Sequence, residues 1–276
     1  MANITASLVN ELRQRTGVGM MDCKKALVES DGDMEKAIEY LREKGQKLAT
    51  KRADRDASEG VVLSGVSADK TFAAIIMMNC ETDFVAKNED FVAFTKSVLD
   101  SAIAANAQTK EEVLALMLPN GVSVETMIVE QVAKIGEKIT LSHYEIIEAP
   151  ATYAYIHQGN GLASIVGFSK AGFDVQGKEI AMQVAAMAPV ALNRDTVPQE
   201  LIEKELEIYR VQIREEGKPE NMIEKIAEGK LNKFFKDSTL LNQDFIRENK
   251  KCVEEYLKEH DKDLTVTGFK RLKLGE

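Results

Sequence analysis

The feature of this sequence that most constrains its fold is the apolar run Phe72–Met78, which leads into a polar segment that contains a phenylalanine. The run has the length of a strand and polar residues on both sides, so it predicts a buried β-strand. Asn88 has a side chain typical of a helix N-cap, and apolar residues follow it at helical spacing. The segment between them, residues 79–88, should therefore connect a strand to a helix.

Asp83 and Phe84 lie side by side in this predicted strand-to-helix loop. Leaving a phenylalanine ring in water costs roughly 25 cal/mol per Å² of apolar area. Either Phe84 packs under the following helix while Asp83 makes a local turn hydrogen bond, or the ring is held out for a partner. The pattern alone slightly favours packing, and it leaves both interpretations open.

The length of the chain, 276 residues, is sufficient for two or three compact units, each with its own core. Its 36 basic and 45 acidic residues give a net charge of −9, which disfavours direct binding to nucleic acid because phosphate backbones require clustered Lys and Arg. Cys23, Cys80 and Cys252 are far apart, which indicates reduced thiols and not a disulfide framework or a zinc site. With no long apolar stretch and no signal-peptide pattern, we expect a cytoplasmic protein without membrane contact.

Residues 1–55 predict a unit of three short helices. The second helix should span Met20–Val28 after a turn that contains two glycines, and Asp33 should cap the third helix. Gly45 is expected to stop this third helix. The charged run Lys47–Asp56 has almost no large apolar residue, which favours a linker or an exposed helical extension.

After residue 56 the pattern changes to strands, and residues 56–149 predict an α+β unit that ends before Pro150. The expected elements are a hairpin of residues 61–63 and 71–79, helical stretches over 89–106 and 110–135, and a strand over 138–147.

A weak internal repeat indicates a second unit of the same kind. The strand pattern of Phe72–Ile76 returns in Leu162–Val166, and Phe173-Asp174 with a helix over 178–187 stands where Asp83-Phe84 and its helix stand in the first copy. Two such segments in one chain favour two α+β subdomains related by duplication. The second subdomain would consist of residues 150–197 together with 236–276.

Residues 198–235 predict an antiparallel coiled-coil hairpin. Apolar residues alternate four and three apart on both sides of Gly217-Lys218-Pro219, which must break the helix. They are Ile202, Leu206, Tyr209 and Ile213 before the break, and Ile223, Ala227, Leu231 and Phe234 after it. The hairpin is either a self-contained helical pair or a docking arm, and the tail after it should form a helix and a last strand over 264–274.

No pattern in the sequence favours catalysis. The Gly17-Val18-Gly19 turn lacks the residues that complete a phosphate-binding loop. The three histidines have no metal-binding spacing and no cysteine close by. We therefore expect no catalytic residue, no metal and no cofactor, so the remaining candidates are binding features.

Met20 and Met21 form one such feature, directly after the glycine turn. Adjacent residues of a helix cannot both face one small core, so at least one methionine should be exposed and available to a partner, where methionine adapts well. The alternative is that both are partly buried in a loose core.

Two motifs resemble those of bacterial elongation factor Ts: TGVGMMDCKKAL at residues 16–27 and NCETDFVA at residues 79–86. The similarity covers essentially the whole chain and continues through residues 132–137, 155–157, 217–219 and 266–269. It implies an α+β fold with an N-terminal three-helix module like a ubiquitin-associated (UBA) domain. It also implies a core of two related α+β subdomains with antiparallel sheets, an inserted coiled-coil hairpin and a short C-terminal module.

The resemblance further implies a guanine-nucleotide exchange factor of elongation factor Tu, the GTPase that delivers aminoacyl-tRNA. Such a factor promotes GDP release and stabilises the nucleotide-free GTPase until GTP binds. Asp83 and Phe84 would intrude beside the magnesium site of the GTPase, whereas Arg13, Met20 and Met21 would contact its nucleotide domain. The interface residues implied by the resemblance are Arg13, Met20, Met21, Thr82, Asp83, Phe84, Val85 and Gln183.

Two positions depart from the family pattern. Gln183 stands where the family often has a histidine, and residues 158–162 lack an arginine common in the corresponding loop, so those contacts must be replaced or absent. An alternative function is a non-exchanging adaptor, which would bind the GTPase or another protein through the helical module and the hairpin without changing nucleotide release. A ribonucleoprotein component would need a basic patch that the charge distribution does not supply.

Overall fold

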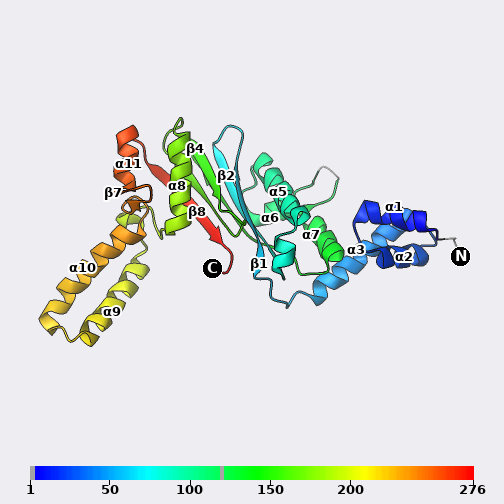
Figure 1. Cartoon of the computed structure of the whole chain (residues 1–276), viewed down its shortest axis with the longest axis horizontal. Coiled ribbons are helices and arrows are strands. Elements are labelled where there is room, and N and C mark those ends of the chain that lie inside the picture. The colour runs from blue at the N-terminus through cyan, green and yellow to red at the C-terminus, as the bar shows by residue number, and fades with distance from the viewer. Residues whose placement is uncertain (1–3, 119–120) are drawn as a thin grey trace.

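Two antiparallel sheets stacked face to face form the centre of the molecule (Figure 1). The computed structural model describes residues 4–118 and 121–276. The first three residues of the predicted helical unit, and residues 119–120 of the helical stretch predicted over 110–135, lie outside the described residues. Helices cover the outer face of each sheet, which confirms a mixed fold with antiparallel sheets.

The first sheet contains β1 (Glu59–Val66), β2 (Phe72–Cys80) and β3 (Thr140–Glu148), in the order β1-β2-β3. β1 and β2 form the predicted hairpin. Every residue of β2 is buried because the strand is covered on both sides, and successive side chains of a strand point to opposite faces. The residues that face the helices are Phe72, Ala74, Ile76, Met78 and Cys80, and those that face the second sheet are Ala73, Ile75 and Met77.

The second sheet contains β4 (Ala151–Ile156), β5 (Leu162–Phe168) and β8 (Val266–Lys273), in the order β4-β5-β8. In both sheets a hairpin leads to a helix, and a later strand pairs antiparallel with the second strand of the hairpin. This shared topology confirms two related α+β halves. β4 was not predicted, because a six-residue run next to Pro150 is too short to stand out without its partner strand.

The two sheets share one apolar layer and are also joined by backbone hydrogen bonds. The N–H of Val62 in β1 donates to the carbonyl of Asn160 at 2.6 Å, and the N–H of Thr152 donates to the carbonyl of Lys70 at 2.7 Å. The buried members of the layer are Val62, Ala73, Ile75, Met77, Ile147, Ala163 and Ile165.

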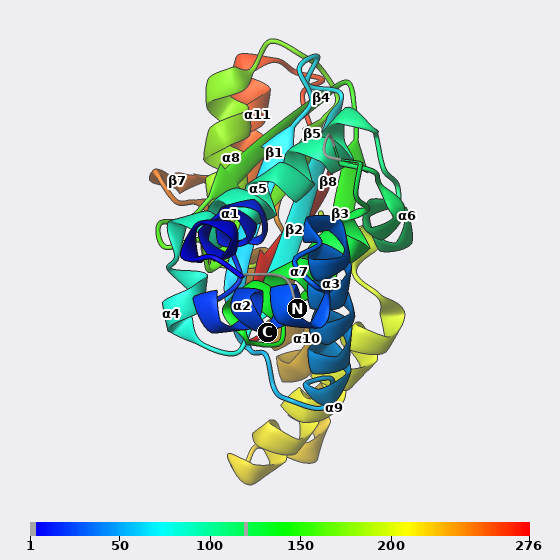
Figure 2. The same cartoon turned by 90° about the vertical axis from the view of Figure 1, so that its right-hand side faces the viewer.

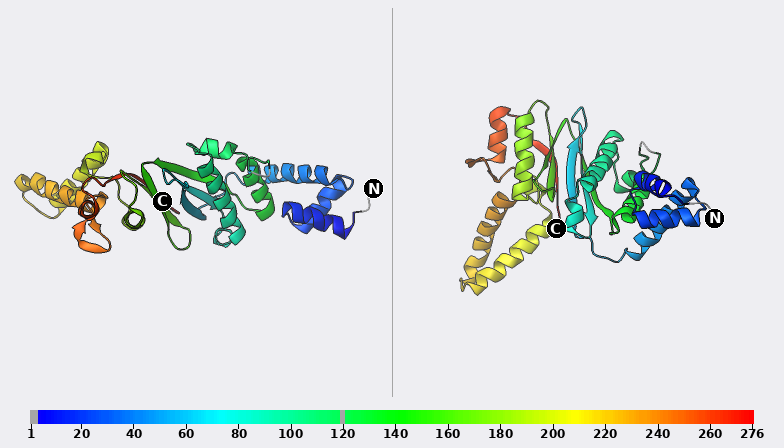
Figure 3. Two further views of the ribbon diagram at one scale, coloured as in Figure 1. Left: turned by 90° about the horizontal axis from the view of Figure 1, so that it is seen from above. Right: turned by 45° about the vertical axis from the view of Figure 1, so that its right-hand side comes forward.

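Helices from the two halves cover the outer faces of the sheets (Figure 3). The first sheet is covered by α5 (Glu89–Ala104), α6 (Lys110–Ala115) and α7 (Val124–Ile135), and the second by α8 (Asp174–Met187) and α11 (Val253–His260). α6 and α7 replace the single helical stretch predicted over 110–135. α8 begins earlier than the predicted residue 178, and the small β6 (Asp244–Phe245) and β7 (Glu248–Cys252) precede α11.

The N-terminal unit contains α1 (Ala6–Thr16), α2 (Met20–Glu29) and α3 (Met34–Lys51) around a small apolar core of its own. Gly45 does not stop α3, contrary to the prediction, because the helix continues to Lys51. α3 instead crosses α7 at this glycine: a Cβ there would lie 2.9 Å from Cβ of Ala133 and 3.2 Å from the carbonyl oxygen of Val129. The missing side chain lets the two helices approach closely. The first half of the charged run Lys47–Asp56, up to Lys51, continues α3.

The helical hairpin lies at the opposite end of the molecule from the N-terminal unit (Figure 1). It consists of α9 (Gln199–Glu215) and α10 (Glu220–Ser238), preceded by the 3-10 turn Arg194–Thr196. The predicted seam forms, with Ile213 and Ile223 buried where the two helices meet near the turn. At the other end Phe235 is buried and Phe234 is only half-buried, so the seam ends one residue later than predicted.

Gly45 and Gly229, two glycines inside helices, give a test of the crossing between α3 and α7. Gly45→Val should lower the free energy of unfolding by about 1–3 kcal/mol, because overpacking forces the crossing helices apart. The control is Gly229→Ala in α10, where a Cβ meets nothing within 4 Å. This control should raise the free energy of unfolding by roughly 0.5–1 kcal/mol, since alanine is the better helix former. Urea unfolding measures both changes, and a stabilising Gly45→Val would contradict the crossing.

Candidate functional site

The segment predicted as a strand-to-helix loop is a helix of one turn, α4 (Asp83–Ala86), directly after β2. Thr82 caps it, since its hydroxyl accepts the N–H of Val85 at 3.4 Å. Phe84 is 82% exposed, so of the two interpretations left open by the sequence the structure excludes packing under the next helix and has the ring held out. α4 projects at the edge of the molecule in Figure 2.

The packing of α4 explains the direction of Phe84. Val85 and Ala86 pack against the core that α5 and the first sheet share. Because a four-residue helix makes about one turn, the residue that precedes these two must point away from that core. α5 then begins after Asn88, whose side chain accepts the N–H of Asp90 at 2.8 Å as predicted.

Asp83 is held in its ionised form beside the exposed ring. The ammonium of Lys87 donates to its carboxylate at 2.6 Å, one helical turn further along. This hydrogen bond lowers the pKa of Asp83 below its ordinary value. Asp83 therefore presents a negative charge next to Phe84 at neutral pH.

The carboxylate of Glu137 holds Glu81 and Thr82, the two residues that precede α4. Glu137, directly after the C-cap of α7, accepts the N–H of Glu81 at 3.1 Å and the N–H of Thr82 at 3.0 Å with the same oxygen. Its other oxygen accepts the hydroxyl of Thr82 at 2.7 Å. The start of α4 is thus bound to the end of α7.

The carboxylate of Glu81 in turn binds the backbone next to Glu137 and two arginines that follow α3. Its carboxylate accepts the N–H of Lys138 at 2.6 Å and pairs with Arg52 at 2.6 Å and Arg55 at 3.2 Å, just beyond the end of α3. Its side chain is only 13% exposed. Burial would raise the pKa of Glu81, but the Lys138 N–H and the two guanidinium groups outweigh it, so this pKa lies below its ordinary value.

Met20 and Met21 are exposed at the start of α2, by 55% and 75% respectively, which excludes the alternative of a loose core. Cys23, Ala26 and Leu27 bury the other face of the helix. Gly17 ends α1 in the left-handed conformation, with φ +70°, and so allows the sharp turn before them.

Lys134 of α7 connects this turn to the region of α4. A Cβ at Gly17 would lie 3.0 Å from Cδ of Lys134, and the ammonium of Lys134 reaches the carboxylate of Asp90 at 3.4 Å. Arg13 is also exposed, one turn before the end of α1. Lys134 therefore links the turn before the methionine pair to the start of α5, the helix that follows α4.

The second copy of the strand–helix unit does not present its aromatic residue in the same way. Phe173 is half-buried and packs against the core of the second sheet. Only the first copy holds a phenylalanine out from the surface.

Gln183 lies far from the other candidates and inside the protein. It is 0% exposed, donates to the side chain of Gln243 at 3.1 Å and accepts the N–H of Ile246 at 2.9 Å. The side chain therefore connects α8 to the segment of β6, and no atom of it is exposed to a partner in this structure.

Comparison with known proteins adds to this geometry. A family profile described as Elongation factor TS matches residues 81–276. Proteins called Elongation factor Ts are 52% identical in Christiangramia forsetii and 50% identical in Flavobacterium psychrophilum, with the full length of both chains covered. The protein of that name from Porphyromonas gingivalis is 46% identical over 99% of this chain and 98% of its own length. The chain belongs to the elongation factor Ts family.

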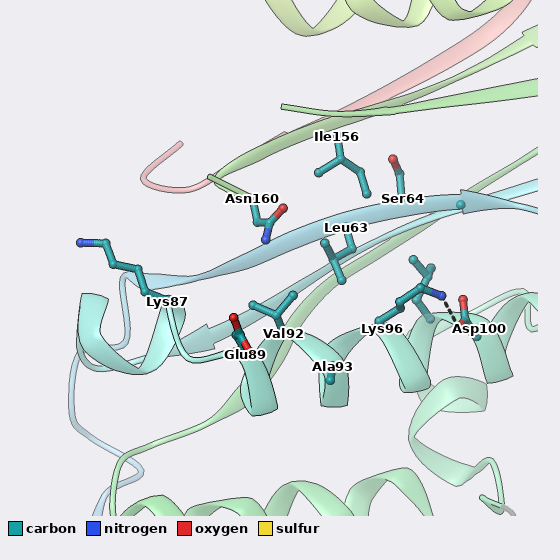
Figure 4. A pocket seen from close by; sticks show the side chains of 12 residues that line it. Leu63, Ser64, Lys87, Glu89, Val92, Ala93, Lys96, Asp100, Ile156 and Asn160 are labelled. Carbon is teal, nitrogen blue, oxygen red and sulfur yellow. Dashed lines mark hydrogen bonds and ion pairs between the residues drawn. The ribbon is translucent and has the colours of Figure 1, made fainter. Parts of the chain in front are cut away.

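A hollow of about 520 Å³ lies beside α4, between β1 and α5 (Figure 4). The apolar side chains of Leu63, Val92 and Ile156 line it, and Lys87 lies at the end next to α4. In this member of the elongation factor Ts family, Lys87 thus both lines the hollow and pairs with Asp83 of α4.

Among residues 4–118 and 121–276 the structure has no cluster of His, Cys, Asp and Glu suited to a metal ion. The three histidines, His143, His157 and His260, are exposed. No helix in these described ranges is long and apolar enough to cross a membrane.

Glu81, Glu137 and Arg52 were missed by the sequence analysis. Glu137 lies inside one of the segments that resemble elongation factor Ts, but its sequence neighbours give no signal of its role. Its partners are 55 and 56 residues away, so only the fold brings them together.

The lowered pKa of Glu81 predicts a pH dependence of stability. Since its pKa is lower in the folded chain, its contacts stabilise the fold above the ordinary carboxyl pKa of about 4.3 and are lost as the pH falls through the lowered value. Glu81→Gln should be less stable at pH 7 by about 1–3 kcal/mol. Its melting temperature should then fall less between about pH 6 and pH 3 than that of the parent. Glu125→Gln, at an exposed position of α7, serves as the control, and parallel pH profiles for Glu81→Gln and the parent would contradict the prediction.

Proposed function

We propose that this member of the elongation factor Ts family promotes GDP release from elongation factor Tu by inserting Phe84 beside the magnesium site of the GTPase. Family membership makes the chain a guanine-nucleotide exchange factor of that GTPase. The observation that supports the role of Phe84 is its exposure on a helix whose start is held by Thr82, Glu81 and Glu137. As a translation factor it would act in the cytoplasm.

Exchange of this kind needs no chemical catalyst. The factor must bind the nucleotide-free GTPase more tightly than the nucleotide-bound form, and by linkage it then weakens nucleotide binding by the same ratio. The energy comes from contacts that exist only in the nucleotide-free complex. We therefore assign contact roles, and no acid or base role, to the residues of this chain.

Phe84 is suited to supply such a contact. Its ring is exposed in the free factor, so its apolar surface leaves water only when a partner covers it. Burying the ring is worth roughly 1.5–3 kcal/mol, or about ten- to a hundredfold in an equilibrium. A wedge of this size between helices of the GTPase would deform the site that holds the phosphates.

Asp83 would add an electrostatic effect. A carboxylate placed near the ligands of Mg²⁺ competes with them for the ion and its water, and the ion holds the nucleotide phosphates. In the free factor Lys87 pairs with Asp83, so part of this effect requires that pair to open.

Arg13, Met20 and Met21 would form a second contact, with the nucleotide domain of the GTPase. Lys134 lies against Gly17, beside this group, and pairs with Asp90 in the first turn of α5, the helix after α4, which supports a contact face that includes both. Thr82 and Val85 would support Phe84 from below. Gln183 is an internal bridge, and we do not include it in the contact face.

We also propose a division of labour along the chain. Residues 1–55 and 56–149 would carry the contact face, residues 150–197 with 236–276 would support it, and 198–235 would form a separate arm.

Phe84→Ala should slow GDP release at saturating factor by about ten- to a hundredfold, because the wedge is lost. Stopped-flow release of fluorescent GDP from elongation factor Tu measures it. Val175→Ala is the matched control: Val175 is an exposed apolar residue in the first turn of α8, the corresponding helix of the second half. An unchanged rate for Phe84→Ala would refute the proposed wedge, and binding without any acceleration by the parent chain would favour the adaptor.

Asp83→Ala should slow release less than Phe84→Ala does, because the ring can still deform the phosphate site. The same stopped-flow assay, repeated over a range of Mg²⁺ concentrations, separates the two residues. The Asp83→Ala defect should shrink at low Mg²⁺, where the ion no longer holds the nucleotide. A complete loss of exchange in Asp83→Ala would show that the ranking is wrong.

A further inference from the structure

We infer that Glu137 is a positioning residue for exchange: its carboxylate holds the start of α4 and thereby fixes the direction in which Phe84 points. This inference rests on the proposed role of Phe84. It concerns a residue outside the predicted contact set, at the end of α7 and after its cap residue Gly136.

Glu137 supplies hydrogen-bond acceptors to backbone N–H groups at the point where the first sheet ends. β2 pairs with β3 as far as Asn79 and with β1 as far as Cys80, so its backbone from Glu81 onward has no ladder partner. Half-buried N–H groups left there without acceptors cost free energy. The N–H groups of Glu81 and Thr82 both donate to one oxygen of Glu137, at 3.1 Å and 3.0 Å.

The hydroxyl of Thr82 couples this carboxylate to α4. It donates to Glu137 at 2.7 Å and accepts the N–H of Val85 at 3.4 Å, which a hydroxyl can do at once. Thr82 is therefore oriented by Glu137 while it caps the helix that carries Phe84. A change at Glu137 would reach Phe84 through a single residue.

The short length of α4 makes this orientation matter. A helix of four residues cannot hold its own geometry in water, because nucleation of a helix is unfavourable. Val85 and Ala86 anchor one face of α4, and the cap at Thr82 anchors its start. Without Glu137 the exposed ring would sample more directions, and ordering it on the GTPase would cost binding energy.

The contacts of the Glu81 carboxylate connect the start of α4 to the N-terminal helical unit as well. Glu81 binds Arg52 beyond the end of α3 and the N–H of Lys138, the residue after Glu137. The ammonium of Lys138 donates to the carbonyls of Ala53 and Arg55 at 2.6 Å and 2.8 Å. The start of α4 is thus held between the end of α7 and the end of α3.

The test compares GDP release from elongation factor Tu at saturating factor with the factor concentration that gives half-maximal release. Glu137→Ala should lower the saturated rate by roughly three- to tenfold, and change the half-maximal concentration less, since the other contacts remain. Glu137→Gln should recover part of the rate, because its amide oxygen still accepts the two N–H groups. Glu125→Ala, at an exposed position of α7, should leave the rate unchanged.

A double-mutant cycle then decides whether Glu137 acts through Phe84. In a Phe84→Ala background, Glu137→Ala should lower the rate by less than about twofold, because the group it positions is gone. An equal effect in both backgrounds, or a loss explained by a lower melting temperature, would overturn the inference. If Glu137→Ala does not fold, Glu137→Gln replaces it in the same cycle.

Hydrogen exchange separates failure of this inference from failure of the proposed function. The amides of Glu81 and Thr82 should exchange faster in Glu137→Ala than in the parent. Faster exchange with an unaffected rate in Phe84→Ala would refute the wedge and leave Glu137 as a structural anchor only, which overturns the positioning role as well. Unchanged amide exchange would overturn the positioning role even if Phe84 matters.

Discussion

The burial of β2 on both of its faces is the constraint on which the rest of the structure depends. One face of the strand packs against α5 and its neighbours, and the other packs against the second sheet. Few strands of an antiparallel sheet are covered on both sides, because such sheets commonly leave one face to solvent. β2 is therefore a fixed reference in the core, and α4 follows it after only two residues.

Because α4 follows a buried strand so closely, the exposed ring of Phe84 lies on residues that are held in place. The ring of Phe84 is exposed, yet Cys80, Thr82 and Val85 around it are tied into the core or its edge. Binding sites gain affinity when their contact groups are ordered before the partner arrives. The carboxylates of Glu81, after β2, and Glu137, before β3, provide that order without adding apolar surface.

Much of the fold could be predicted from local patterns, because strand alternation, helix spacing and cap residues act within a few positions. The caps at Asp33 and Asn88 and the seam of the hairpin belong to this class. Gly45 was misinterpreted because a glycine that ends a helix and one that lets two helices cross look alike in sequence. Local pattern left the direction of Phe84 open between two alternatives, and it gave no signal of the bond between Thr82 and Glu137, which are 55 residues apart. The motif resemblance pointed to the segment of α4 as the candidate site, but only the fold shows how that segment is held.

The apolar layer between the two sheets has a consequence for how the chain folds. Ala73, Ile75 and Met77 lie in the apolar layer that the two sheets share, so each half buries this face against the other half. The helical hairpin closes its seam on itself and can melt separately, but the two halves must gain or lose structure together. During synthesis the inner face of the first sheet would thus stay exposed to water until Ala163 and Ile165 of β5 have been made and can cover it.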